Sequence, residues 1–163
     1  MDFQKQHIKT SVVACIIDDH DHVLLTQRNI EPFCDQWVMP GGKIDHGEPI
    51  LEALHREVRE EVGLEIGIDR LIDVYEHVGV GEANDHYVIL YYQAHPHSDT
   101  LTPNPGEVAR AQWVSAQQFS QLDMTPGTRH ILAQVFPGSL VDPGVPDDEL
   151  ASLTQCPIVN SEF

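Results

Sequence analysis

Basic residues are scarce in this chain of 163 residues, which has 9 Lys and Arg against 26 Asp and Glu and a formal net charge of -17. A surface of that sign repels the backbone of a nucleic acid, so the sequence disfavours a nucleic-acid polymer as partner. A small phosphate ligand stays compatible, because a bound divalent cation reverses the sign of the field locally. Solubility alone also explains an acidic surface.

Long apolar runs are lacking as well, and none approaches the roughly 20 residues that cross a bilayer. The start of the chain, MDFQKQHIKT, does not have the charged segment followed by an apolar block that marks a secretory signal. We therefore expect no membrane partner and a cytoplasmic location.

Cysteine chemistry is sparse. The chain has 3 cysteines, Cys15, Cys34 and Cys156, and no C-x-x-C pair, which argues against a disulfide framework and a structural zinc site. The 10 histidines are scattered instead of being set at the spacing of metal ligands. Cys15 lies in the apolar run SVVACII and is expected in the core.

The length fits one domain, which we assign to residues 1–136. Residues 137–163 form a tail that is dense in Pro, Gly and Asp. Its apolar end, CPIV, is compatible with packing on the domain or on a second subunit, so a homodimer is one expectation.

Alternating strand and helix signals within the domain predict a mixed α/β (α+β) fold. Runs rich in β-branched and aromatic residues predict strands at 7–17, 22–28, 68–78, 86–95 and 108–114. The turn formers at 18–21 join the first two runs, which we expect to pair as a β-hairpin. Capping residues and prolines predict helices at 48–62, at 115–122 and from Thr125 to 136.

The first of these helices carries an unusual concentration of glutamate. At about 100° per residue, the carboxylates of Glu57, Glu60 and Glu61 fall on one arc and converge. The neighbouring arc is apolar and is expected to face the core; its members are Ile50, Leu51, Leu54, Val58 and Val62.

Like charges at this spacing repel one another, and one arginine cannot neutralise three carboxylates. Arg56 lies one turn from Glu52 and from Glu60, where it can form ion pairs and orient the cluster. Oxygen-only ligands suit Mg²⁺ or Mn²⁺, so a divalent cation explains the cluster. A solvated helix face would show the same spacing, and the spacing alone does not separate these readings.

The residues around the helix favour the interpretation as a cation site. Gly42, Glu48, Arg56, Glu57, Val58, Glu60, Glu61, Gly63 and Leu64 fit every fixed position of G-x5-E-x7-R-E-U-x-E-E-x-G-U, where U is aliphatic. This is the Nudix box, and W-x-x-P-G-G precedes it. The chain therefore resembles the Nudix hydrolase family, whose MutT-like members share this motif.

The resemblance implies a mixed β-sheet sandwiched between helices and a metal-dependent hydrolysis of a nucleoside diphosphate linked to another group. It implies Glu57, Glu60 and Glu61 as metal ligands, with the carbonyl of Gly42 as a further ligand. Glu48 and Arg56 correspond to the pair that anchors the loop to the helix. Glu107 resembles a downstream glutamate that assists the metals in some members.

Residues outside the box supply candidates for substrate binding. Arg28 and Lys43 are expected to contact phosphate, and Phe33 is a candidate to stack on a base, whereas Trp37 is expected to be buried. Selectivity is expected from loops and from the start of the last helix, with Glu82 and Thr128 as their representatives. The candidates for the general base are Glu57 and Glu61 within the helix and the loop residues Glu82, Asp85 and Glu107.

The sequence does not identify the group that is linked to the nucleoside diphosphate. ADP-ribose hydrolases of the family often carry a proline a little beyond the box, and no proline occurs between Leu64 and Pro96. The start PGGK resembles members that act on nucleoside triphosphates. Two rival readings are a catalytically inactive nucleotide-binding or sensor module and an isoprenoid diphosphate isomerase that would use Cys34; the intact box favours hydrolysis.

Overall fold

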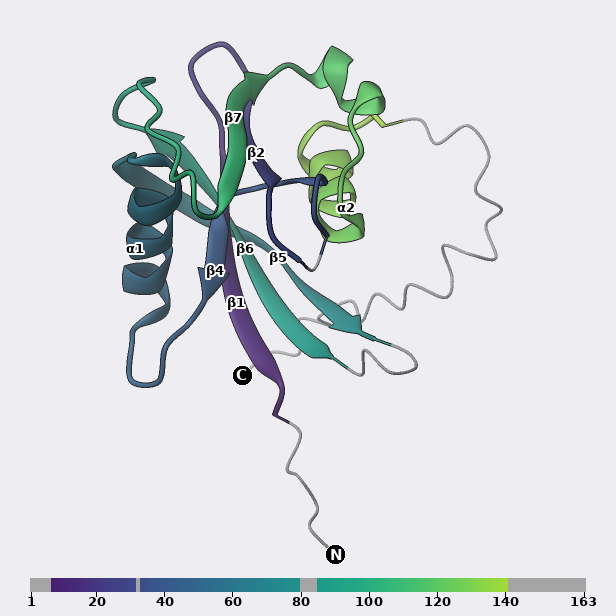
Figure 1. Cartoon of the computed structure of the whole chain (residues 1–163). Coiled ribbons are helices and arrows are strands. Elements are labelled where there is room, and N and C mark those ends of the chain that lie inside the picture. The colour runs from purple at the N-terminus through teal and green to yellow at the C-terminus, as the bar shows by residue number, and fades with distance from the viewer. Residues whose placement is uncertain (1–6, 32, 80–84, 141–163) are drawn as a thin grey trace, which may run out of the picture.

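The computed structural model describes residues 7–31, 33–79 and 85–140. Most strands belong to a four-stranded mixed sheet with the order β4-β1-β6-β5, in which β1 and β6 are parallel and the other pairs are antiparallel. Its strands are β1 (Lys9–Ile16), β4 (Gly41–Lys43), β5 (Ile66–Val78) and β6 (His86–Pro96). The long ribbon of β5 and β6 crosses the whole molecule (Figure 1).

A second, antiparallel sheet has the order β3-β2-β7. It consists of β2 (Val23–Arg28), β3 (Trp37–Val38) and β7 (Val108–Val114). The predicted hairpin of the first two strands is therefore wrong, because β1 and β2 belong to different sheets and meet only in an isolated bridge between Ile17 and Val23. The turn at 18–21 is present, but β1 pairs with β4 and β6, and β2 pairs with β3 and β7.

Helix α1 (Ile50–Val62) carries Glu57, Glu60 and Glu61. It begins after Pro49, which is the N-cap and not a residue of the first turn, and it ends at Gly63 in the left-handed region (φ 72°), where glycine is favoured. Leu54, Val58 and Val62 are buried as predicted, but Ile50 and Leu51 are 39% and 43% exposed. The apolar arc is thus wrong at its N-terminal end, where the helix extends beyond the sheet surface that it covers.

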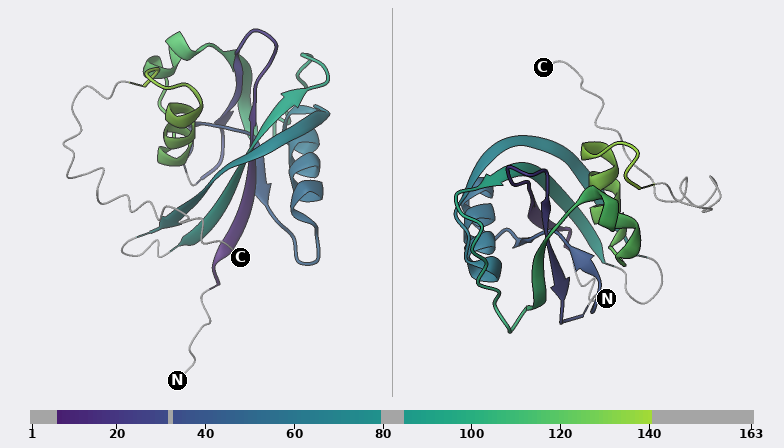
Figure 2. Two further views of the ribbon diagram at one scale, coloured as in Figure 1. Left: turned by 180° about the vertical axis from the view of Figure 1, so that it is seen from behind. Right: turned by 90° about the horizontal axis from the view of Figure 1, so that it is seen from above.

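Two further helical segments lie near the C-terminal end of the described chain. The 3₁₀ helix η2 (Ala116–Gln121) begins after Ser115, whose backbone N–H donates to the Gln118 side chain at 3.0 Å. Helix α2 (Pro126–Val135) begins after Thr125, with Pro126 in its first turn, as predicted. Helices α1 and α2 lie on opposite sides of the sheets (Figure 2), so the predicted mixed sheet between helices is confirmed.

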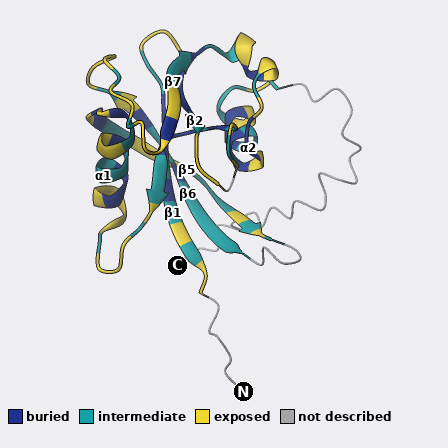
Figure 3. Ribbon diagram, in the orientation of Figure 1, coloured by how far each residue is buried: buried dark blue, intermediate teal, exposed yellow. Residues whose placement is uncertain are grey.

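The core has two parts, because successive residues of a strand face opposite sides of the sheet. On β1, Val12 and Ala14 pack in the cluster under α1, whereas Cys15 packs in the cluster that includes α2. Because both faces are covered, consecutive residues are buried at the end of β1 and at the start of β2, and buried positions lie at the centre of the molecule (Figure 3). None of the helices in the described ranges is long and apolar enough to span a membrane.

Candidate active site

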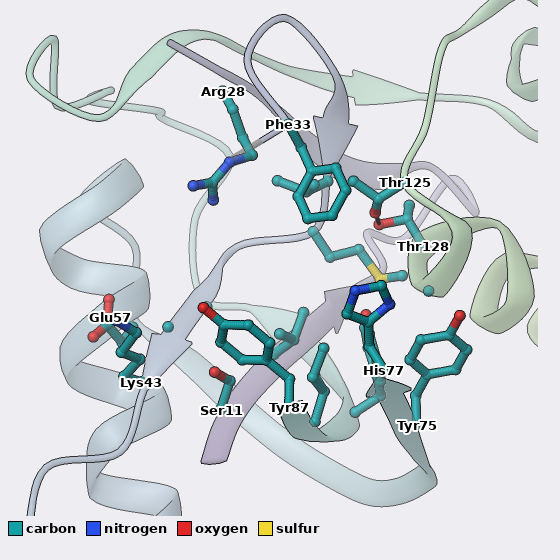
Figure 4. Close-up of a pocket in the computed structure, with 18 of the residues that line it drawn as sticks. Ser11, Arg28, Phe33, Lys43, Glu57, Tyr75, His77, Tyr87, Thr125 and Thr128 are labelled. Atoms are coloured by element: carbon teal, nitrogen blue, oxygen red, sulfur yellow. Dashed lines mark hydrogen bonds between the residues drawn. The ribbon is translucent and has the colours of Figure 1, made fainter. Parts of the chain in front are cut away.

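A cavity of about 480 Å³ opens on the α2 side of the four-stranded sheet. The glutamates of α1 and the glycines of β4 line one end, and the start of α2 lines the other (Figure 4). Between the two ends, side chains of β1, β5 and β6 form the floor. The cavity thus joins a carboxylate-rich end to an aromatic one.

Two of the predicted ligands, Glu57 and Glu61, line the carboxylate end. The pKa of Glu61 is raised to about 8, mainly by burial and in smaller part by the charges of Glu57 and Glu107, while a hydrogen bond from the Gly41 N–H opposes the shift. That N–H donates to Glu61 Oε2 at 3.2 Å. Burial also raises the pKa of Glu57, against the opposing effect of Arg56. Two acids with raised pKa values, facing one cavity, are a frequent mark of a functional site.

Arg56 is the organising cation of α1. Its Nε donates to Glu48 Oε1 at 2.7 Å, and its Nη1 donates to Glu57 Oε1 at 2.8 Å and to Glu60 Oε2 at 3.3 Å. The predicted ion pair with Glu60 is present, but the structure records none with Glu52 in the described chain. Nη2 also donates to the Lys43 carbonyl at 3.2 Å, which ties β4 and the following loop to the helix.

Glu60 does not line the cavity, and its side chain is 52% exposed. The predicted convergence of three carboxylates is therefore incomplete: within the described residues, no three His, Cys, Asp or Glu side chains are already grouped as ligands of one ion. Both Glu57 and Glu60 pair with Arg56. A cation at this end would replace part of that interaction.

The two glycines before the helix are required by close packing. A Cβ on Gly41 would lie 2.3 Å from the Val12 carbonyl oxygen, and a Cβ on Gly42 would lie 2.4 Å from the Glu57 carboxyl carbon. The main chain at Gly42 therefore runs directly beside the Glu57 carboxylate. Carboxylates and a main-chain carbonyl together make the oxygen donor set that Mg²⁺ and Mn²⁺ prefer, so these residues fit the predicted cation.

The remaining charged candidates also lie at this end. Glu107 lines the cavity, and its charge raises the pKa values of Glu57 and Glu61. Arg28, at the end of β2, lines it too and acts in the opposite direction on Glu61. Lys43 is exposed on β4 next to the two glycines. Asp85, one of the candidates for the general base, instead pairs with Lys9 at 2.6 Å.

The aromatic floor was missed in the analysis of the sequence. It consists of Tyr75, His77, Tyr87 and Tyr91, with Ser11, Val13 and Ile89 between them. The available signal was the alternation along 86–95, which places Tyr87, Ile89 and Tyr91 on one face of a strand. Which face borders the cavity depends on the pairing of β6 with β1, and no local pattern encodes that pairing.

Phe33 and Thr128 line the cavity at its aromatic end, as does Thr125. Phe33 is 42% exposed, has a positive φ of 66°, and meets the ring of His77 edge to face at 6.4 Å. Trp37 is 5% exposed and outside the cavity lining, so its predicted burial is confirmed. Glu82 lies outside the described residues, as does Cys156.

Comparison with known proteins decides the family. Residues 7–135 match the family model of the NUDIX domain. The chain belongs to the Nudix hydrolase family. The predicted resemblance is thereby confirmed, and with it the assignment of the chain as an enzyme that acts on nucleotide derivatives.

Individual Nudix proteins agree with this assignment. The uncharacterized Nudix hydrolase YvcI of Bacillus subtilis is 32% identical over 130 residues, which cover 78% of this chain and 79% of that protein. The crystal structure of a MutT NUDIX hydrolase from Burkholderia pseudomallei has a TM-score of 0.70 at 31% identity and covers 80% of this chain and 99% of that one. An 8-oxo-dGTP diphosphatase of Proteus vulgaris is 35% identical over 78 residues, 47% of this chain and 67% of that protein.

Proposed function

We propose that this Nudix hydrolase cleaves a diphosphate bond in a nucleoside diphosphate derivative, with Mg²⁺ or Mn²⁺ as cofactor, and releases a nucleoside monophosphate. The observation that supports this most directly is the cavity itself, in which Glu57 and Glu61 face one end and aromatic side chains line the other. A nucleotide has the same division, with an anionic diphosphate at one end and a flat, weakly polar base at the other.

The cation would be held by Glu57, Glu60 and Glu61 together with the Gly42 carbonyl, and Glu107 would assist. When bound, it would withdraw charge from the diphosphate and lower the pKa of a water molecule. Glu57 and Glu61 supply the carboxylates that can accept the proton of the attacking water. Arg28 and Lys43 are the cavity cations that can contact the phosphates.

Arg56 acts by positioning. It holds the carboxylates of Glu48, Glu57 and Glu60 from one side and the main chain of Lys43 from the other. The ends of the loop and the helix that carry the site are thereby fixed to each other, which lowers the reorganisation needed when substrate binds. Glu107 directly precedes β7 and lies at the same end of the cavity.

The test is to incubate the full chain with a panel of nucleoside diphosphate derivatives and Mg²⁺, and to separate the products by ion-exchange chromatography. The panel should include ADP-ribose, normal and oxidised nucleoside triphosphates, nucleotide sugars and a dinucleoside polyphosphate. Release of a nucleoside monophosphate that stops in excess chelator supports the proposal. Binding of the nucleotides without any cleavage would identify a nucleotide-binding module instead.

Three further expectations belong to this proposal. They are the cytoplasmic location, the division into a domain at 1–136 with a tail at 137–163, and a homodimer contacted by that tail. Size-exclusion chromatography with light scattering, on the full chain and on a chain ending at residue 140, tests the last two together. A dimer that persists without the tail would contradict the assigned role of the tail.

A further inference from the structure

The N-terminal turn of α2 ends in the cavity with hydrogen-bond donors that nothing in the described chain satisfies. Thr125, Pro126, Gly127 and Thr128 all line the cavity. The first N–H groups of a helix have no partners within the helix, and the Thr125 side chain does not cap them, because its hydroxyl bonds to the Thr128 hydroxyl at 2.9 Å. Within the described residues, the N–H groups of Gly127 and Thr128 have no acceptor.

A buried tyrosine reaches the same point from the floor. Tyr91 on β6 is only 4% exposed, lines the cavity, and has no hydrogen-bond partner for its hydroxyl among the residues that the structure describes. Burial raises the pKa of this phenol, so the hydroxyl keeps its proton and can donate it. The hydroxyl is not one of the fully buried polar atoms that lack a partner, so it is accessible from the cavity, where a ligand acceptor can reach it.

Gly127 brings the two features together. A Cβ at this position would lie 2.6 Å from the Tyr91 hydroxyl oxygen and 3.4 Å from the Tyr75 ring. The hydroxyl is therefore in contact with the main chain of the first helical turn. Helix donors and hydroxyl together form one small donor cluster, made of the N–H groups of Gly127 and Thr128 and the hydroxyl of Tyr91.

The surroundings of this donor cluster indicate what it accepts. Lys43 lies beside Glu57 at the opposite end, whereas Thr125, Thr128 and Tyr75 lie together at the aromatic end (Figure 4). Arg28 also lines the cavity, and its charge lowers the pKa of Glu61 at the glutamate end. A site for an anion would be expected to include a cationic side chain. A neutral acceptor on a flat ring instead matches donors that are set among aromatic side chains.

We propose that the N–H groups of Gly127 and Thr128 and the hydroxyl of Tyr91 bind a ring carbonyl oxygen of the substrate base, so that this enzyme prefers nucleotides with oxo-substituted bases. This inference rests on the proposed function, since it places the base at the aromatic end of the cavity and the diphosphate at the glutamate end. A base without a carbonyl leaves the buried donors unsatisfied, and such a loss discriminates more strongly than a loss of apolar contact.

The experiment compares two nucleoside monophosphates that differ at one edge of the base. Inosine 5′-monophosphate carries a 6-oxo group, and purine riboside 5′-monophosphate has a hydrogen there. Calorimetric titration of the full chain with each compound at pH 7 and with Mg²⁺ gives two dissociation constants. We expect inosine monophosphate to bind at least about tenfold more tightly, as one or two buried hydrogen bonds would give.

A variant and its matched control identify the donor. Tyr91→Phe should reduce this preference by about fivefold, because it removes one of three donors. Tyr87→Phe removes a hydroxyl from the same floor, but that hydroxyl accepts from Lys9 Nζ at 3.3 Å, and the preference should be unchanged.

Three outcomes would overturn the inference. The first is equal affinity of the wild-type protein for the two compounds, a result that needs no variant to fold. The second is an equal effect of Tyr91→Phe and Tyr87→Phe on the preference. The third is that inorganic phosphate competes with inosine monophosphate less effectively in Tyr91→Phe than in the wild type. That result would show that the donors bind an anionic group. Because binding is measured and not turnover, failure of the proposed hydrolysis would appear separately, as an absence of monophosphate release in the substrate panel.

Discussion

The guanidinium of Arg56 and the carboxylate of Glu48 form a two-point ion pair, in which Nε donates to Oε1 at 2.7 Å and Nη2 donates to Oε2 at 3.0 Å. Glu48 lies before the first residue of α1, and Arg56 lies two turns into the helix. The pair therefore fixes the loop that follows β4 to the helix that carries the glutamates. Paired contacts of this kind add geometric precision as well as attraction.

Replacing Arg56 with Ala should lower both stability and turnover. Glu48, Glu57 and Glu60 all lose their shared counter-charge, and the melting temperature should fall by roughly 5 °C. Differential scanning fluorimetry in excess chelator and steady-state kinetics with Mg²⁺ measure the two effects. Arg59→Ala is the control on the same helix, because its pair with Glu65 is more than half exposed and contributes little. Equal shifts for the two variants would show that Arg56 has no special role.

Local signals in the sequence predicted the elements that carry the chemistry. The body of α1, its end at Gly63 and the start of α2 at Thr125 and Pro126 depend on residues that lie close together in the chain. The pair of Glu48 and Arg56 was also predicted, but from the family motif, since a loop-to-helix contact has no period of its own. The positions of these elements along the chain could thus be predicted from the sequence, whereas their arrangement in space could not.

Non-local pairing accounts for what the sequence did not predict. The partners of β1 and β2 are set by contacts across long stretches of chain, so the short turn at 18–21 was a misleading cue. Ile50 and Leu51 are exposed because the covered area ends before them. Glu60 is 52% exposed and lies outside the cavity, although helical periodicity places it on the same arc as Glu57 and Glu61.

Removal of divalent metal should abolish turnover. Full activity in excess EDTA would contradict the assignment of the glutamates to a cation.

Glu60→Gln and Glu61→Gln should each lower kcat by at least about a hundredfold, while circular dichroism stays unchanged. The comparison of these two variants is informative, because Glu61 lines the cavity and Glu60 does not. If Glu60→Gln retains wild-type activity, the exposed position of Glu60 persists in the working enzyme.

The metal-free protein should lose stability as the pH rises. Glu61 has a pKa of about 8 in the folded state against an ordinary value of 4.5, so between these values the folded state holds a proton that the unfolded state has released. The stabilisation is therefore complete below the lower value and is lost as the pH rises through the higher one, with a slope of about 1.4 kcal/mol per pH unit at most.

Urea unfolding in EDTA between pH 5.5 and about 8.5 measures this dependence. Other carboxylates and histidines contribute their own slopes, so the quantity to compare is the difference between wild type and Glu61→Gln. The glutamine side chain resembles the protonated acid and can still accept from the Gly41 N–H. Identical pH dependence in the two proteins would show that Glu61 is already ionised in the folded state at neutral pH.

A methyl group at Gly127 should strain the contact between α2 and the floor of the cavity. The added Cβ would lie 2.6 Å from the Tyr91 hydroxyl oxygen, and overpacking of this kind lowers the free energy of unfolding by about 1–3 kcal/mol. Gly106→Ala is the control, because its nearest neighbour would be at 3.4 Å. The double variant Gly127→Ala with Tyr91→Phe should recover part of the loss, since the clashing oxygen is gone. Additive losses would place the strain elsewhere.

Substrate selectivity should depend on residues at the aromatic end and not on the glutamates. Phe33 is half-exposed on a loop at the cavity edge, so Phe33→Ala removes an aromatic contact with little effect on stability. Its φ of 66° suits a smaller residue no worse than phenylalanine. Thr128 is buried and bonded to Thr125, and Thr128→Ser keeps that hydroxyl while it removes a methyl group.

Both variants, and Glu82→Gln at a position outside the described residues, should reorder kcat/KM across the substrate panel. Glu61→Gln should instead depress kcat for every substrate by a similar factor, because the transition-state charge that it helps to stabilise is common to all diphosphates. Two quantities are compared for each variant: the rank order of the substrates by kcat/KM, and the mean loss of kcat across the panel. An unchanged order in the loop variants, or a larger reordering by Glu61→Gln than by Phe33→Ala, would mean that the two ends of the cavity do not divide recognition from chemistry.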